Sequence, residues 1–163
     1  MDKDKAIKQE KEYPETWNII RETLNDTVFG YEHLLSLKKS IPKELYAYLL
    51  RNIWKMTTDC ISIELALKMF EDVLPEDLMF DDELEAIRNF QENIVIYRGA
   101  DNNEKRPRLS WTLRKSVATN NSDFAKGRLF KATIPKSKII MYIAHDGDEE
   151  EIVAFVESGF ERL

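Results

Sequence analysis

The spacing of apolar residues changes near residue 90, and this change constrains the fold more than any other feature of the sequence. Before it, apolar residues recur every three or four positions, which places them on one face of a helix. After it, they form short runs or alternate with polar residues, as in strands. The first part predicts helices over residues 17–24, 28–37, 45–56, 63–74 and 81–90.

Two details of the helical part concern its boundaries. Residues 42–74 fit either one long helix or two. Pro75 is expected to end the fourth helix, because proline lacks the N–H that a helix interior needs. Asp81 and Asp82 are expected to cap the fifth helix and form its acidic first turn.

The second part predicts about five strands and one further helix. The strands are expected over residues 94–97, 109–113, 128–134, 138–143 and 151–156, with a last short strand after Ser158–Gly159. The segment between Leu113 and Gly127 is expected to be helical. Helices followed by strands indicate an α+β fold with a mostly antiparallel sheet that the helices cover.

No linker is long enough to separate two independent domains. A single compact domain over residues 1–163 is therefore expected, with a helical lobe at 1–90 and a β-rich core at 91–163. The helical lobe has 12 basic and 19 acidic residues, and the core has 12 and 11. Because neutralising phosphates requires clustered cations, no nucleic-acid partner is expected.

The cysteine and histidine content and the length of the apolar runs exclude disulfide-rich, metal-binding and membrane-spanning classes of protein. Cys60 is the single cysteine, so an intramolecular disulfide framework is excluded. His33 and His145 lie far apart in the sequence, and no metal site is predicted. No apolar run approaches the roughly 18–20 residues that span a bilayer, and the charged N-terminus does not resemble a signal peptide. We expect a cytoplasmic protein without a membrane partner.

The first of three segments with candidate chemistry ends the strand at 94–97. Arg98 follows Tyr97, and a guanidinium at a strand end can bind a phosphate or a carboxylate with two hydrogen bonds. Gly99 permits a sharp turn or the close approach of a ligand. The alternative is a turn with a surface arginine.

The second segment contains two hydroxyl residues in one strand. Ser110 and Thr112 are two positions apart, so their side chains share one face while Trp111 points to the other. Two neighbouring hydroxyls can orient a carboxylate or bind ribose oxygens. The alternative is a half-exposed strand whose tryptophan lies in the core.

The third segment is an acidic run that leads into an apolar strand. Glu149 and Glu151 are expected to share one face, where they could act as general base and electrostatic stabiliser. A shift of one residue would instead select Asp148 and Glu150, but the step into Ile152 favours the first pair. The alternative is a solvated acidic loop.

In this order, the three segments resemble the arginine–serine–glutamate arrangement of the ADP-ribosyltransferase superfamily, in its cholera-like and binary-toxin-like class. The similar segments are YRG at 97–99, LSWT at 109–112 and EEEIV at 149–153. The segment that ends at Asp123–Phe124–Ala125 is similar to small bacterial and phage-encoded members. The resemblance covers about residues 94–156.

The resemblance implies a role for each candidate residue, with NAD as the substrate. Arg98 would bind an NAD phosphate, next to Gly99. Tyr97 or Trp111 would stack on the nicotinamide, and the predicted direction of Trp111 argues against the tryptophan. Ser110 would organise the site by bonding Arg98 or the catalytic carboxylate. Thr112 would brace the strand. Glu151 would be the catalytic residue, and Glu149 would position an acceptor.

The implied function is an NAD-dependent mono-ADP-ribosyltransferase that modifies a protein or another macromolecule. A second interpretation is an inactive protein-interaction module with the same fold, such as a prophage-encoded regulator or inhibitor. For that interpretation, the acidic helical half would provide the partner surface.

Overall fold

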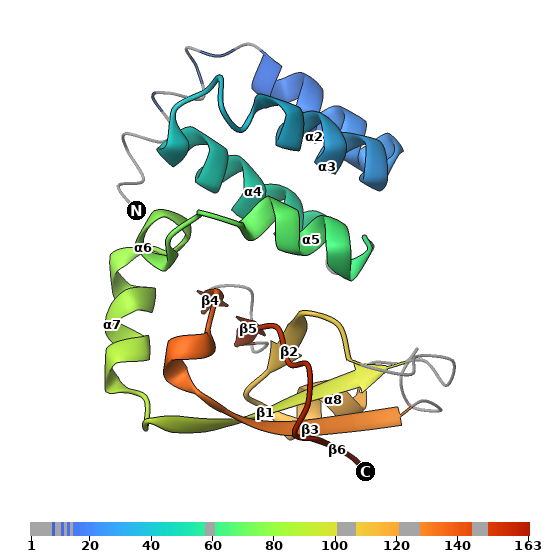
Figure 1. The fold of residues 1–163 in the computed structure, drawn as a ribbon, viewed down its shortest axis with the longest axis vertical. Helices are drawn as coiled ribbons and strands as arrows, with labels where there is room; N and C mark the ends of the chain where they lie inside the picture. Colours follow the sequence, from blue (N-terminus) through green and yellow to red (C-terminus); the bar gives the residue numbers. More distant parts are fainter. Residues whose placement is uncertain are drawn as a thin grey trace. The chain divides into compact units, whose positions relative to one another are not determined.

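The computed structural model describes residues 8, 11, 13, 15–57, 61–100, 107–120, 128–144 and 150–163. The chain divides into two compact units, residues 1–81 and 82–163. The first consists of helices, and the second is built on a six-stranded sheet (Figure 1). The predicted α+β fold with an antiparallel sheet is confirmed, whereas the single domain stays a prediction.

The helical unit contains five described helices, of which α6 was not predicted and the other four overlap predicted spans. They are α2 (Glu15–Asn25), α3 (Thr27–Leu37), α4 (Lys43–Thr57), α5 (Ile63–Phe70) and α6 (Pro75–Leu78). Asp26 caps α3 by accepting a hydrogen bond from Phe29 N at 3.1 Å, and Ser62 caps α5 through Leu65 N at 3.1 Å. Residues 42–74 thus hold two separate helices.

The expected role of Pro75 was wrong. The fourth helix ends at Phe70, and Pro75 is the first residue of the short α6. Proline suits this position because the first N–H of a helix has no partner within the helix anyway, and its fixed φ fits the first turn.

The core of the helical unit forms where α4 packs against its neighbours. Leu45, Leu49 and Ile53 are buried, as their spacing predicts, but Met56 is 42% exposed. Trp54 lies edge-on against Phe70 of α5, with ring centroids 5.2 Å apart. The apolar face predicted for the helix over residues 45–56 therefore extends one turn too far.

The sheet unit begins with α7 (Asp81–Asn89), which starts where the two aspartates predict. Its strands are β1 (Asn93–Ala100), β2 (Ser110–Thr112), β3 (Arg128–Pro135), β4 (Met141–Ile143), β5 (Glu151–Val153) and β6 (Phe160–Arg162). Their order in the sheet is β4-β5-β2-β1-β3-β6, and all neighbouring pairs are antiparallel. The sixth strand is the one expected after Ser158–Gly159.

Several strand and helix boundaries differ from the predictions, and the strand expected over residues 151–156 is the shorter β5, which ends at Val153. The first strand does not end at Arg98–Gly99 but continues through Ala100, because β3 pairs with it along its full length. Residues 136–138 form a 3-10 helix, so β4 starts only at Met141. The helix expected between 113 and 127 is α8 (Lys115–Asn120), which contacts β1 and β2, while residues 121–127 lie outside the described residues.

The sheet twists strongly between β1 and β2. In Figure 1, β1 and β3 run across the view, whereas β4, β5 and β2 are seen nearly end-on. Tyr97 and Thr112 form the single pair in register between β1 and β2. Within the described ranges, no helix is long and apolar enough to cross a membrane.

Candidate functional site

The strand order brings the three candidate segments together. Arg98 lies on β1, Ser110 on β2 and Glu151 on β5, and these strands are neighbours in the order β5-β2-β1. The register places Thr112 opposite both Tyr97 and Glu151. Segments that are distant in the sequence thus meet on three adjacent strands.

A series of hydrogen bonds links the three residues. The Ser110 hydroxyl donates to Glu151 Oε1 at 2.6 Å, and Arg98 Nη1 donates to the Ser110 carbonyl oxygen at 2.8 Å. All three residues are half-buried. A charge-assisted bond of this length is stronger than a neutral one, so the serine holds the Glu151 carboxylate in a defined orientation.

Arg98 reaches Ser110 from an unexpected direction. Alternation along β1 puts Tyr97 on the face of Thr112 and Glu151, whereas Arg98 is in register with the buried Phe130. Arg98 therefore bonds to the backbone carbonyl of Ser110 rather than to its hydroxyl. Tyr97, half-buried, is the β1 side chain that shares a face with the carboxylate.

The other two residues of β2 have structural contacts. Thr112 is buried, and its Oγ1 accepts a hydrogen bond from Arg114 N at 3.0 Å, which fixes the turn after the strand. Trp111 points to the opposite face, as alternation predicts, and its Nε1 donates to Ala154 O at 3.2 Å.

Gly99 is buried within β1, opposite Leu129 of β3.

The consecutive glutamates of the acidic run have different partners. Glu151 is the first residue of β5 and bonds to Ser110, whereas Glu150 accepts hydrogen bonds from Arg114 Nε at 2.7 Å and from the Tyr142 hydroxyl at 3.4 Å. This arrangement favours Glu151 over Glu150 as the carboxylate of the site. Glu149, also predicted here, lies outside the described residues.

Sequence reasoning missed the contacts that hold β4 beside the site. Burial raises the pKa of Tyr142, and the nearby Glu150 carboxylate raises it further, so the hydroxyl stays protonated and donates. The Tyr142 ring lies edge-on against Phe90, with centroids 5.4 Å apart. After β4, Ala144 N donates to the fully buried Glu83 of α7 at 3.1 Å. Glu83 and Ala144 lie 61 positions apart, so no local pattern in the sequence indicated this contact.

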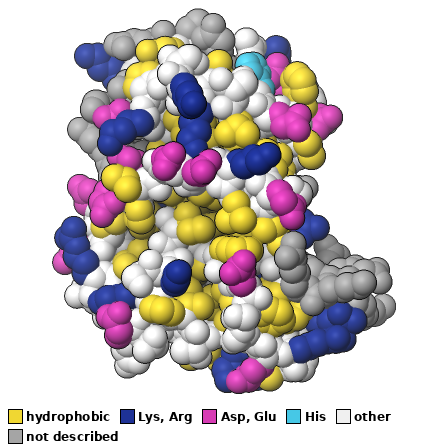
Figure 2. All heavy atoms as spheres, in the orientation of Figure 1, with side chains coloured by type: hydrophobic (Ala, Val, Ile, Leu, Met, Phe, Trp, Pro, Cys, Tyr) yellow, Lys and Arg dark blue, Asp and Glu magenta, His cyan; other side chains and the backbone are white. Residues whose placement is uncertain are grey.

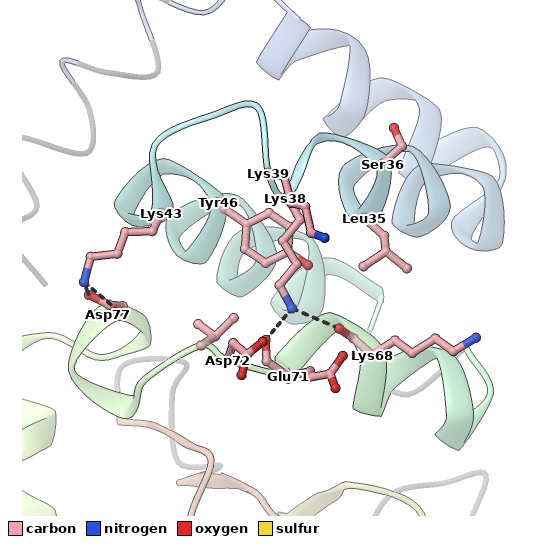
Figure 3. Close-up of a pocket in the computed structure, with 11 residues that line it drawn as sticks. Leu35, Ser36, Lys38, Lys39, Lys43, Tyr46, Lys68, Glu71, Asp72 and Asp77 are labelled. Carbon is pink, nitrogen blue, oxygen red and sulfur yellow. Dashed lines mark hydrogen bonds and ion pairs between the residues drawn. The ribbon is translucent and has the colours of Figure 1, made fainter.

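A cavity of about 650 Å³ lies in the helical unit, and no predicted site residue lines it (Figure 3). Lys38 Nζ crosses it to donate to the carbonyl oxygens of Glu71 and Lys68, the latter at 3.2 Å. Lys43 pairs with Asp77 at 3.5 Å. Lys38 thus joins the end of α3 to the end of α5, and Lys43 joins the start of α4 to α6, which gives both lysines a structural role.

Charges on the helical unit are mixed in sign. Figure 2 shows acidic and basic side chains intermingled on the drawn face of this unit. Although the helical part carries the acidic surplus, this face therefore presents no patch of a single sign. Among the described residues, no group of three or more His, Cys, Asp or Glu side chains could hold a metal ion.

The sequence matches no protein-family model, and comparisons with curated proteins and with solved structures find no match.

Proposed function

We propose that this chain is an NAD-dependent mono-ADP-ribosyltransferase that acts on a protein or another macromolecule in the cytoplasm. The observation that supports this most is the hydrogen-bonded series from Arg98 through Ser110 to Glu151. The Ser110 hydroxyl holds the Glu151 carboxylate, and its backbone carbonyl accepts from the Arg98 guanidinium, so the three half-buried residues are linked in the chain order of the resemblance.

Glu151 carries the proposed chemistry. Its carboxylate bonds to the 2′-hydroxyl of the nicotinamide ribose, and its negative charge stabilises the oxocarbenium-like transition state as the bond to nicotinamide breaks. Nicotinamide leaves with the bonding electron pair, and a nucleophile of the acceptor forms the new bond to the same ribose carbon and releases its proton to solvent. Ser110 contributes by holding the carboxylate in one orientation.

The residues of β1 bind NAD in this proposal. Arg98 bonds an NAD phosphate, for which a guanidinium offers paired N–H donors in a planar fork. Tyr97 shares the face of Glu151 and stacks on the nicotinamide ring, and Gly99 allows the dinucleotide to approach the strand. Thr112 supports the site by bracing the turn after β2, and Glu149 positions the acceptor.

The experiment measures NAD binding by calorimetry and nicotinamide release by chromatography. We expect Glu151→Gln to lower kcat by about 100-fold or more, because the stabilising charge is removed. Arg98→Lys keeps the charge but loses the fork, so KM for NAD should rise by about 10-fold. Glu157→Gln, an exposed position after β5, is the matched control and should behave as wild type.

A protein that neither binds NAD nor releases nicotinamide with a cell lysate as acceptor source would refute the proposal. The interaction module would then be favoured, and a captured partner that still binds Glu151→Gln would support it.

A further inference from the structure

Glu150, the residue directly before Glu151, has an unusual backbone conformation. Its φ is 40°, in the left-handed region, and Asp72 (φ 57°) is the single other non-glycine residue with positive φ in the described part of the chain. The Cβ atom makes this conformation unfavourable, and glutamate lacks the short side chain with which Asn and Asp stabilise it. Contacts elsewhere must therefore hold Glu150.

Those contacts come from two segments of the sheet unit. Glu150 Oε2 accepts from Arg114 Nε at 2.7 Å, and its Oε1 accepts from the Tyr142 hydroxyl at 3.4 Å. Its carbonyl oxygen also accepts from Leu113 N at 3.4 Å. One residue thus ties the turn after β2 to β4, immediately before the candidate catalytic residue.

The two residues that hold Glu150 differ in their own surroundings. Arg114 is restrained at its backbone by the bond from its N–H to Thr112 Oγ1. Tyr142 is 4% exposed, lies against Phe90 and pairs in register with Ile152 of β5. The Glu150 carboxylate is thus bound by a buried tyrosine on one side and by an exposed arginine with a restrained backbone on the other.

We propose that Glu150 is a positioning residue, which fixes the entry into β5 so that the Glu151 carboxylate meets the Ser110 hydroxyl. Arg114 also compensates the negative charge next to Glu151, which keeps the two carboxylates on separate partners. This inference rests on the proposed function, in which Glu151 is catalytic. It adds Arg114 and Tyr142 to the groups on which that function depends.

Two substitutions at this position separate the side-chain contacts from the backbone conformation. Glu150→Gly removes the contacts but suits the left-handed backbone, whereas Glu150→Gln keeps an amide oxygen that can accept from Arg114 Nε and an amide N–H that can donate to the Tyr142 hydroxyl oxygen. We expect Glu150→Gly to lower kcat for nicotinamide release by about 100-fold, because a small misplacement of a reacting group has such an effect. KM for NAD should stay within about twofold, and Glu150→Gln should recover most of the kcat.

Asp72→Gly is the matched control, since it places glycine at the other positive-φ position, in the helical unit. It should keep the wild-type kcat. The positioning role is wrong if Glu150→Gly turns over NAD at the wild-type rate, if it changes KM alone, or if Asp72→Gly lowers kcat as much.

A second measurement does not depend on turnover. In protein with ¹³C-labelled glutamate, the carboxyl resonance of Glu151 reports its bond to Ser110. We expect Glu150→Gly to move this resonance to its position in Ser110→Ala, and Glu150→Gln to leave it in place. If the wild type consumes no NAD but this shift occurs, the proposed function fails and the positioning role stands. An unchanged resonance in Glu150→Gly overturns the positioning role even in an active enzyme.

Discussion

Ser110 and Glu151 are joined by a 2.6 Å hydrogen bond although they lie 41 positions apart in the sequence. The antiparallel pairing of β2 with β5 makes this contact possible, because Glu151 lies opposite Thr112, two residues from Ser110 on the same face. The serine side chain thus connects the strand next to Arg98 with the strand that begins at the glutamate.

Removal of this hydroxyl should weaken catalysis more than NAD binding. A hydrogen bond to a charged group contributes about 1.5–3 kcal/mol, which corresponds to about 10- to 100-fold in rate. We expect Ser110→Ala to lower kcat for nicotinamide release within that range and to leave KM for NAD within about twofold. Ser137→Ala, at an exposed position in the 3-10 helix, is the control. A rise in KM at unchanged kcat would contradict this role for Ser110.

A second prediction concerns the contact between α2 and α3. A Cβ atom on Gly30 would meet Thr23 Oγ1 and would lie 2.5 Å from Thr23 Cα and 2.6 Å from Thr23 N. Backbone atoms cannot rotate away, so Gly30→Ala should destabilise the protein by about 3 kcal/mol. The melting temperature should fall by about 6–12 °C in a circular dichroism melt.

Two further variants test the cause of this effect. Glu32→Ala, at an exposed position of α3, should change stability by less than about 0.5 kcal/mol. Adding Thr23→Ala to Gly30→Ala should restore stability only in part, because the backbone atoms of residue 23 remain. Full recovery would show that the hydroxyl alone causes the clash.

The sequence predicted most elements of the fold because local spacing determines them. The apolar period places α3 within one residue of its observed start, and α7 starts at Asp81, the first of the two aspartates that indicated its beginning. Met56 was misjudged for a non-local reason. The spacing continues the apolar face of α4 through Met56, but only the packing of the neighbouring helices decides where burial ends.

The proximity of the candidate site residues followed from the resemblance rather than from local spacing. Nothing in the sequence states that β2 lies between β1 and β5. The bond from Arg98 to a backbone carbonyl was not predictable either, because it depends on the register and twist between two strands. For the same reason, the contact between Tyr142 and Glu150 was missed, since pairing of β4 with β5 creates it.

Stability at alkaline pH should depend on Tyr46 of α4. This side chain is 2% exposed and its hydroxyl donates to Met69 O at 3.1 Å. Burial raises its pKa above the ordinary 10.0, so the folded protein holds the phenolic proton more tightly than the unfolded chain does. The resulting contribution to stability is complete below pH 10.0 and is lost as the pH rises from there toward the folded pKa.

Urea unfolding of wild type and Tyr46→Phe between about pH 8 and pH 11 tests this. At the lower pH, the variant should be less stable by about 1 kcal/mol, because the hydrogen bond to Met69 is lost. Above pH 10.0, the difference in free energy of unfolding between wild type and variant should narrow. Only the wild type loses stability there, since the variant has no phenol to ionise at this position. If the free energies of unfolding of the two proteins change in parallel with pH, Tyr46 does not cause the alkaline loss of stability.

The hydrogen bond between Trp111 and Ala154 leads to the last prediction. Both residues are buried, and the indole Nε1 donates to Ala154 O at 3.2 Å. Trp111→Phe keeps an aromatic ring but leaves this carbonyl without its indole donor, which should destabilise the protein by about 1–3 kcal/mol. The urea midpoint should fall while the slope of the transition is unchanged.

Because Trp111 faces away from Ser110 and Glu151, NAD turnover per folded molecule should stay near the wild-type value. A wild-type midpoint would mean that the bond contributes nothing, and a large rise in KM for NAD would place the indole at the nicotinamide instead of Tyr97.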